Sequence, residues 1–189
     1  MRHAPRVFLS TVFATCVAAG PNVACAEDLP MVDGLPGGNA ESRTCPDEAV
    51  MTGLRVRFGI MLDAIGIRCR RINANGTLGS EFDDGSMMGG TGGTVRVTSC
   101  PSGTVIVGQR LVRSLVPPFG LVQVGFTCRG WSPTLRTTYG ATAVVVVWKS
   151  NLSAHGTSDD CSAPSRPVRR VRTRAGIYVN AAGFTCLST

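Results

Sequence analysis

Arginine side chains at alternating positions are the clearest chemical feature of this sequence. Arg170, Arg172 and Arg174 would project from one face of a strand. Arg55 and Arg57 precede a cysteine at the same distances as Arg172 and Arg174 do. A ridge of guanidinium groups can bind acidic glycans, lipid headgroups or nucleic acid by releasing counterions. The alternative is a solvated strand face that keeps a sheet edge from aggregating.

Side chains suited to catalysis or metal binding are scarce. Asp63 has no identifiable partner carboxylate, which a hydrolase would need. The acidic runs at Glu81–Ser86 and Asp159–Asp160 lack the spacing of a calcium loop and are interpreted as polar turns. Trp131 and Trp148 are more typical of core or edge aromatics than of a sugar platform. We therefore expect no enzyme activity, no cofactor and no bound metal.

The N-terminus has the pattern of an export signal. Residues 1–26 combine Arg2 and Arg6 with a short apolar run and a small-residue cleavage pattern ending at Ala26. A membrane anchor or a lipidated Cys25 are the alternatives, but the apolar run is short for a bilayer span. We expect a secreted or periplasmic protein without a transmembrane span, which also makes nucleic acid an unexpected partner.

Cysteine spacing predicts an internal repeat. Cleavage after residue 26 would leave six of the eight cysteines, and His155 as the only histidine. The six fall into three similar intervals, and each closing cysteine is preceded by glycine three positions earlier and an apolar residue two positions earlier. Six cysteines allow 15 pairings. The repeat favours disulfides within each interval: Cys45 with Cys69, Cys100 with Cys128, and Cys161 with Cys186.

The segments between paired cysteines have the period of β-strands. Leu54, Val56 and Phe58 alternate with arginines, which predicts a half-buried strand. Each interval is interpreted as a β-hairpin, with its turn near Gly59, Gly120 or Gly176 in the three cases. The valine-rich run Ala143–Trp148 is expected to be a buried strand.

Three motifs together resemble the β-prism proteins. They are Gly53–Cys69, Gly89–Gly93 and Ala175–Cys186, and the first two repeats share a C-P-x-x-x-V-x-x-G opening. The nearest resemblance is to the vitelline membrane outer layer protein I type and, more distantly, to jacalin-like lectins. It implies an all-β, disulfide-stapled β-prism of three antiparallel Greek-key sheets. The expected organisation is a linker at residues 27–33 and a single domain at 34–189, with repeats at about 34–88, 89–140 and 141–189.

The resemblance to jacalin-like lectins also implies a sugar site, in which a glycine-rich loop lies beside a G-x-x-x-D loop. A carboxylate can accept two sugar hydroxyls, and glycine lets the backbone approach. The second repeat has Val122 at the aspartate position and is expected to lack a site. The matching residues are Gly59, Ile60, Met61 and Asp63 in the first repeat, and Gly176, Tyr178 and Asn180 in the third.

Two readings of these residues remain open. Asp63 either contacts sugar or ties down its own turn through backbone hydrogen bonds. The protein is correspondingly either a secreted, lectin-like binding protein for glycans or anionic polysaccharide, or a structural or envelope-associated scaffold without a sugar site.

Overall fold

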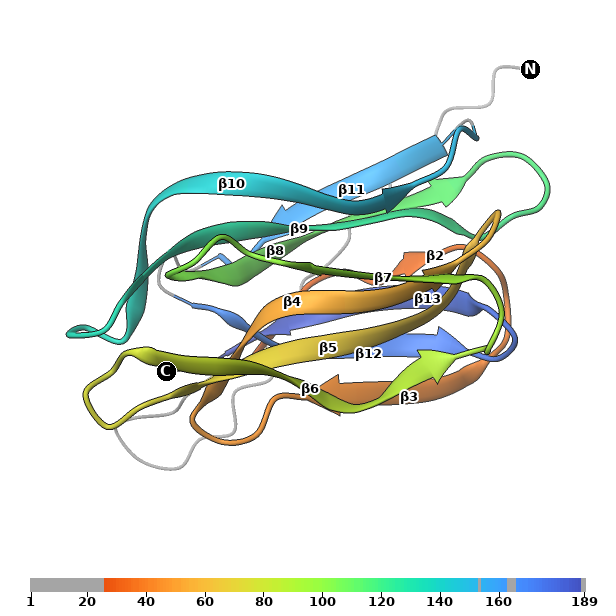
Figure 1. The fold of residues 1–189 in the computed structure, drawn as a ribbon. Coiled ribbons are helices and arrows are strands. Elements are labelled where there is room, and N and C mark those ends of the chain that lie inside the picture. Colours follow the sequence, from red (N-terminus) through yellow and green to blue (C-terminus); the bar gives the residue numbers. More distant parts are fainter. Residues whose placement is uncertain (1–25, 153, 163–165, 188–189) are drawn as a thin grey trace, which may run out of the picture.

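The computed structural model describes residues 26–152, 154–162 and 166–187. All of the expected export signal except Ala26 therefore lies outside the described residues. Within them the chain forms thirteen β-strands in three antiparallel sheets (Figure 1). The strands are β1 (Glu27–Asp28), β2 (Val32–Asp33), β3 (Asn39–Thr44), β4 (Ala49–Phe58), β5 (Leu62–Ile72), β6 (Leu78–Gly89), β7 (Thr94–Ser99), β8 (Thr104–Ser114), β9 (Leu121–Ser132), β10 (Thr137–Lys149), β11 (Ala154–Asp160), β12 (Val168–Ala175) and β13 (Val179–Cys186). No helix among these residues is long and apolar enough to cross a membrane.

Each sheet has the strand order of a Greek key, as predicted. The first sheet is ordered β6-β5-β4-β7 and the second β10-β9-β8-β11, so that in both the fourth strand returns beside the first. The third sheet is ordered β1-β13-β12-β3, with β2 also paired to β13. It completes the same pattern with strands from opposite ends of the chain.

The three predicted hairpins and disulfides are confirmed. The hairpins β4–β5, β8–β9 and β12–β13 turn at residues 59–61, 115–120 and 176–178. The disulfides join Cys45 to Cys69, Cys100 to Cys128, and Cys161 to Cys186. Each bridge closes a similar length of chain at the end of its hairpin away from the turn.

The segment at residues 27–33 differs from the expected linker. It contains β1 and β2, which both pair with β13. The expected repeat boundaries also fall inside sheets: the first sheet spans residues 49–99, and the second spans 104–160. Cysteine spacing marks the hairpins correctly, but both edge strands of each sheet come from chain outside its disulfide-closed interval.

The inner faces of the three sheets form one core. Fully buried side chains alternate along the central strands, such as Leu54 and Val56 in β4, Phe126 in β9 and Phe184 in β13. The glycines three positions before each closing cysteine, Gly66, Gly125 and Gly183, are closely covered by neighbouring atoms. A Cβ at Gly125 would lie 2.6 Å from the carbonyl oxygen of Val145, for example.

Three local expectations were wrong. The run Ala143–Trp148 lies in edge strand β10, where only its end is buried, and Val144 and Val146 are 58% and 50% exposed. Glu81–Ser86 and Asp159–Asp160 lie within β6 and β11 rather than in turns. All three segments belong to edge strands, whose outer face is solvated, so their composition follows exposure more than strand propensity.

An arginine bridges each pair of neighbouring sheets. Arg43 of β3 donates to Ser86 Oγ of β6 at 2.9 Å. Arg96 of β7 donates to the Val147 carbonyl of β10 at 3.1 Å. Arg113 of β8 donates to the Asp33 carbonyl of β2 at 3.4 Å. The three corners of the molecule are therefore closed by side chains where no strand pairing occurs.

Candidate functional site

All three hairpin turns lie at one end of the molecule (Figure 1). Met61 of the first turn packs on Gly120 of the second turn. A Cβ on Gly120 would lie only 2.5 Å from the Met61 sulfur. Gly90 packs against the Ile177 carbonyl of the third turn, too closely to admit a side chain. The turns and the glycine-rich segments therefore form one continuous surface, which we call the turn end.

At the turn end, Asp63 lies beneath the glycine-rich loop of residues 89–93. The Gly90 amide donates to the Asp63 carbonyl oxygen at 2.8 Å, which fixes the loop to the turn. Arg57 holds the same loop from the side by donating to the Thr91 carbonyl at 3.1 Å. Gly92 faces Asp63 Oδ1 and Gly93 faces Oδ2. The structure thus brings together the two loops that sequence placed 26 residues apart.

The Asp63 carboxylate is buried without full hydrogen bonding. Its residue is 6% exposed, and Oδ2 is buried with no hydrogen-bond partner. Burial raises the pKa of Asp63 above its ordinary value of 3.8, and the nearby Gly59 amide and Arg57 offset part of that rise. A buried acceptor without a partner costs stability, which marks this carboxylate as a candidate functional group.

The other predicted residues of the first turn are divided between surface and interior. The Gly59 amide donates to the Met61 carbonyl at 3.0 Å and closes the turn. Ile60 is 66% exposed at the tip. Met61 is buried, and its side chain packs against Gly120 of the second turn. The residues missing from the sequence-based site are Gly92 and Gly93, for which the run of four glycines in Gly89–Gly93 was the available signal.

The third turn has the same construction with different loops. The Asn180 side chain donates through Nδ2 to the Pro36 carbonyl at 3.3 Å. The main-chain carbonyl of Asn180 accepts hydrogen bonds from the Gly34 and Leu35 amides. The glycine-containing segment 34–38 therefore faces the third turn rather than the first. Tyr178 of the same turn is 37% exposed, and a Cβ at Gly176 would meet no atom within 4 Å.

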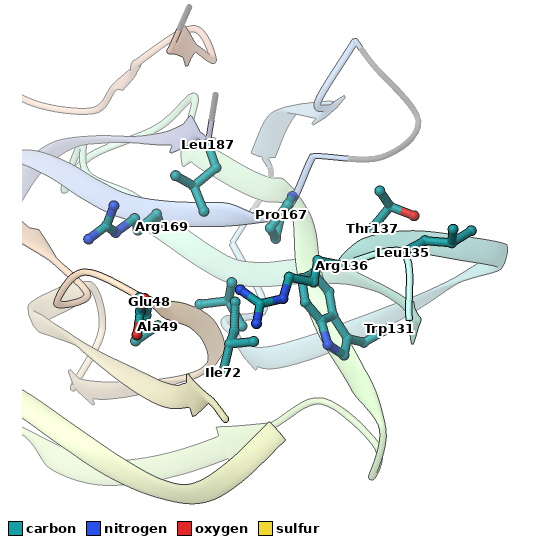
Figure 2. Close-up of a pocket in the computed structure, with 11 residues that line it drawn as sticks. Glu48, Ala49, Ile72, Trp131, Leu135, Arg136, Thr137, Pro167, Arg169 and Leu187 are labelled. Carbon is teal, nitrogen blue, oxygen red and sulfur yellow. The ribbon is translucent and has the colours of Figure 1, made fainter. Parts of the chain in front are cut away.

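A pocket of about 470 Å³ lies at the opposite end, which we call the base (Figure 2). It is formed where the ends of all three sheets meet, and Trp131 is buried in its wall. No cluster of three or more His, Cys, Asp or Glu side chains suited to a metal occurs among residues 26–152, 154–162 and 166–187.

The predicted arginine ridge is split between two sheets. Arg170, Arg172 and Arg174 do share one face of β12, where they line a groove of about 410 Å³. Arg172 pairs with Asp28 at 3.3 Å, and Arg174 pairs with Asp33 at 2.6 Å. Arg55 and Arg57 lie on β4 in the first sheet. The acidic partners on β1 and β2 come from the segment expected to be a linker.

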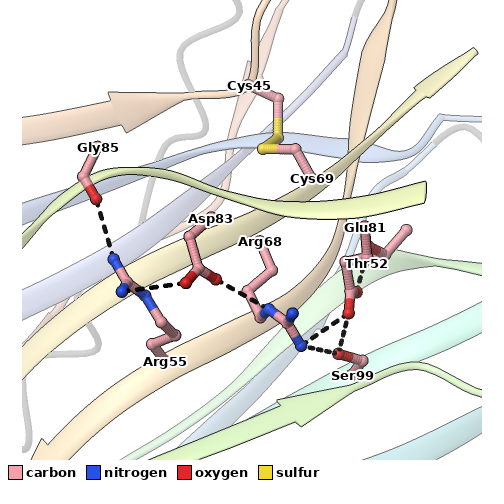
Figure 3. Close-up of polar contacts among 9 residues, drawn as sticks. All are labelled: Cys45, Thr52, Arg55, Arg68, Cys69, Glu81, Asp83, Gly85 and Ser99. Atoms are coloured by element: carbon pink, nitrogen blue, oxygen red, sulfur yellow. Dashed lines mark hydrogen bonds and ion pairs between the residues drawn. A yellow bond between two sulfur atoms is a disulfide. The ribbon is translucent and has the colours of Figure 1, made fainter. Parts of the chain in front are cut away.

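Arg55 belongs to a polar network on the outer face of the first sheet (Figure 3). It pairs with Asp83 at 3.1 Å, and Asp83 also pairs with Arg68 at 3.0 Å. Arg68 continues to Glu81 at 2.7 Å, whose other oxygen accepts from Thr52 at 2.6 Å. The network crosslinks β4, β5 and β6, and so leaves Arg55 structurally engaged.

Replacing Arg68 with methionine is expected to lower the free energy of unfolding by about 2 kcal/mol, because Glu81 and Asp83 then lose a charged donor. Urea unfolding measures the loss. The same change at Arg70, which forms no ion pair with any described residue of the chain, is the control. Equal losses for both variants would contradict a stabilising role for the network.

Comparison with known proteins establishes the fold. No family model matches the chain and no curated protein sequence matches it, so the resemblance to vitelline membrane outer layer protein I stays a prediction. A Malaysian banana lectin is 17% identical with a TM-score of 0.57, over 87% of this chain and 99% of that chain. A mannose-specific jacalin-related lectin from Morus nigra, in complex with mannose, is 13% identical with a TM-score of 0.56, over 93% and 100%.

A mannose-binding jacalin-related lectin from Ananas comosus is 16% identical with a TM-score of 0.55, over 87% of this chain and 99% of that chain. These matches, with three antiparallel Greek-key sheets, confirm the predicted β-prism fold. At such identities the similarity shows the fold alone, and the chemistry must be argued from the residues of this chain.

Proposed function

We propose that this protein is a non-catalytic, lectin-like carbohydrate-binding protein whose site is the Asp63 carboxylate beneath the glycine-rich loop. The observation that carries the proposal is the buried carboxylate with an unpartnered oxygen, at the point where the two loops meet. In this proposal a sugar hydroxyl donates to Oδ1, which faces Gly92, because Oδ2 is enclosed by Gly93. Glycines above it keep side chains away and expose backbone groups.

The solved structures of similar fold support the same class of ligand, since they include a lectin in complex with mannose. A neutral glycan is favoured over an anionic polysaccharide. In the groove of β12, Arg172 and Arg174 are paired with Asp28 and Asp33, and the remaining charge of Arg170 is offset by Glu41 on the same lining. Little net charge therefore remains there to attract a polyanion.

The third turn is a weaker, second site in this proposal. Asn180 keeps an acceptor oxygen but carries no charge, and its amide is engaged by Pro36. Tyr178 offers a partly exposed ring that can pack on a sugar face. Three disulfides in a small domain fit a protein that works outside the reducing cytosol, and we propose that it is secreted or periplasmic.

Gly92→Ala tests the first site directly. A Cβ at Gly92 would lie 3.5 Å from Asp63 Oδ1, an ordinary contact that leaves the fold intact but covers the carboxylate. We expect about a tenfold loss of affinity, the size of one charged hydrogen bond, without a change in melting temperature. A glycan array at low and moderate salt identifies the sugar, and calorimetry then measures the affinity.

Gly176→Ala is the matched control, because its Cβ would meet no atom within 4 Å and lies at the third turn. Affinity lost in Gly176→Ala but kept in Gly92→Ala would transfer the site to the third turn. If the protein instead binds every polyanion, and this binding weakens as the salt concentration rises, the result would favour the arginine ridge as the site. Silence on the array would favour the scaffold reading.

A further inference from the structure

The pocket at the base has a predominantly apolar lining drawn from all three sheets (Figure 2). Its volume of about 470 Å³ lies within the range of small-molecule sites. Its apolar residues are Ala49, Val50, Ile72, Trp131, Leu135, Pro167 and Leu187. These come from the starts of β4 and β12, the ends of β5, β9 and β13, and the turn between β9 and β10. The lining residues are far apart in the sequence, and they come together only when the three sheets close into the prism.

The pocket has one rigid wall and one exposed wall. Trp131 is fixed by a hydrogen bond from Nε1 to the Gly76 carbonyl at 2.9 Å, and it packs with Val50 in a small cluster separate from the main core. Leu135, in contrast, is 72% exposed at the tip of the β9–β10 turn. A large apolar side chain held in water beside an apolar pocket gains contact area when a ligand fills the space.

A cation stands at the rim next to these apolar walls. Arg136 extends from the β9–β10 turn toward Ile72 (Figure 2). Its Nη2 donates to the Ala74 carbonyl at 3.1 Å, and it makes no ion pair with any residue in the described part of the chain. Arg169, by comparison, is engaged by Asp47 and the Cys45 carbonyl. Arg136 is therefore the rim cation with charge to offer a ligand.

The backbone at the rim is held in a sparsely populated conformation. Glu48 and Arg136 have φ angles of 56° and 49°, and they are the non-glycine residues with positive φ among residues 26–152, 154–162 and 166–187. Both line this pocket. Such conformations cost free energy and persist where the surrounding structure imposes them, often at binding sites.

We propose that the base pocket binds a small amphiphile with an aliphatic body and a carboxylate head. The aliphatic chain lies against Trp131, Ile72 and Leu135, and the carboxylate pairs with Arg136. Glu48, on the rim beside Ala49, disfavours a second anionic group. This site is separate from the glycan site at the turn end and does not depend on it.

Calorimetry with decanoate tests the proposal, with decanol and decylamine as ligands of equal chain length. Wild-type protein is expected to bind decanoate saturably at one site, at least about tenfold more tightly than the other two. Arg136→Gln, which keeps a non-glycine residue at this φ, should remove that preference while leaving decanol binding unchanged. Leu135→Ser should lower the affinity for every ligand that binds the wild-type protein.

Leu115→Ser is the matched control, since Leu115 is also an exposed leucine in a hairpin turn but lies at the turn end. It should leave decanoate affinity unchanged. Absence of saturable decanoate binding overturns the proposal. So does decanoate affinity that survives both Arg136→Gln and Leu135→Ser, and so does decylamine binding as tight as decanoate binding.

Discussion

Replacing Asp63 with asparagine is expected to lower glycan affinity about 100-fold and to raise the melting temperature at neutral pH. Affinity falls because an amide presents one acceptor where the carboxylate presents two charged ones. Stability rises because the substitution removes a buried carboxylate whose Oδ2 has no partner. Calorimetry with the array-selected glycan and thermal unfolding give the two readouts.

The pH dependence of stability follows from the raised pKa of Asp63. When the folded-state pKa exceeds the unfolded value, the stability associated with the group is fully present below the unfolded value and is lost as pH rises through the folded one. The stability advantage of Asp63→Asn over the wild type should therefore shrink on acidification and vanish below about pH 3.8. Wild-type glycan affinity should fall over the same acidic range, beginning above the pH at which an ordinary aspartate is protonated.

Asp84→Asn provides the control, because Asp84 lies in β6 of the same sheet, five positions before Gly89, and pairs with Ile67 rather than with the first turn. It should change neither glycan affinity nor its pH dependence. A lower melting temperature for Asp63→Asn, with glycan affinity preserved, would show instead that Asp63 ties down its turn. The scaffold reading would then gain support.

Removing a disulfide is the substitution with the largest expected effect on stability. The Cys100→Ala, Cys128→Ala double variant should lose about 3 to 4 kcal/mol of unfolding free energy, because the bridge no longer restricts a loop of 28 residues in the unfolded chain. Urea unfolding of oxidised protein measures the loss. A loss of this size is a large fraction of the total unfolding free energy of a small domain.

The other two bridges provide an internal comparison. Their loops of 24 and 25 residues are so similar that the entropic model predicts losses within a few tenths of a kcal/mol of each other. Removal of Cys45–Cys69 and of Cys161–Cys186 tests this equality. A loss below about 1 kcal/mol for any pair would show that its native packing, rather than loop closure, governs the effect.

Local features of the fold were predictable because they repeat. Alternating apolar residues and a glycine three positions before each closing cysteine identified the hairpins, and the three intervals identified the disulfides. The pairing of Asp63 with a glycine-rich loop came only from family resemblance, which supplied the motif but not the loop contacts. Gly90 and Thr91 reach the first turn because β6 and β7 flank it in the sheet.

Features that depend on distant parts of the chain were not predictable. Arg172 and Arg174 of β12 are engaged by Asp28 and Asp33, more than 140 positions earlier in the chain. The base pocket combines residues between Glu48 and Leu187. Burial along Ala143–Trp148 was overestimated because composition cannot distinguish a central strand from an edge strand. In each case the missing information is which strands become neighbours.

The third sheet combines strands from both ends of the chain, and this determines the order in which the sheets can form. The first and second sheets use continuous stretches of chain, and each can pair its strands as soon as that stretch has been synthesised. Strands β1, β2 and β3 must wait for β12 and β13, so the contacts of highest sequence separation form last. The early part of the chain therefore stays without its strand partners throughout synthesis. The pairing of β13 with β1 and β2 completes the prism. Until it forms, these unpaired strands can pair with strands of other incompletely folded molecules instead.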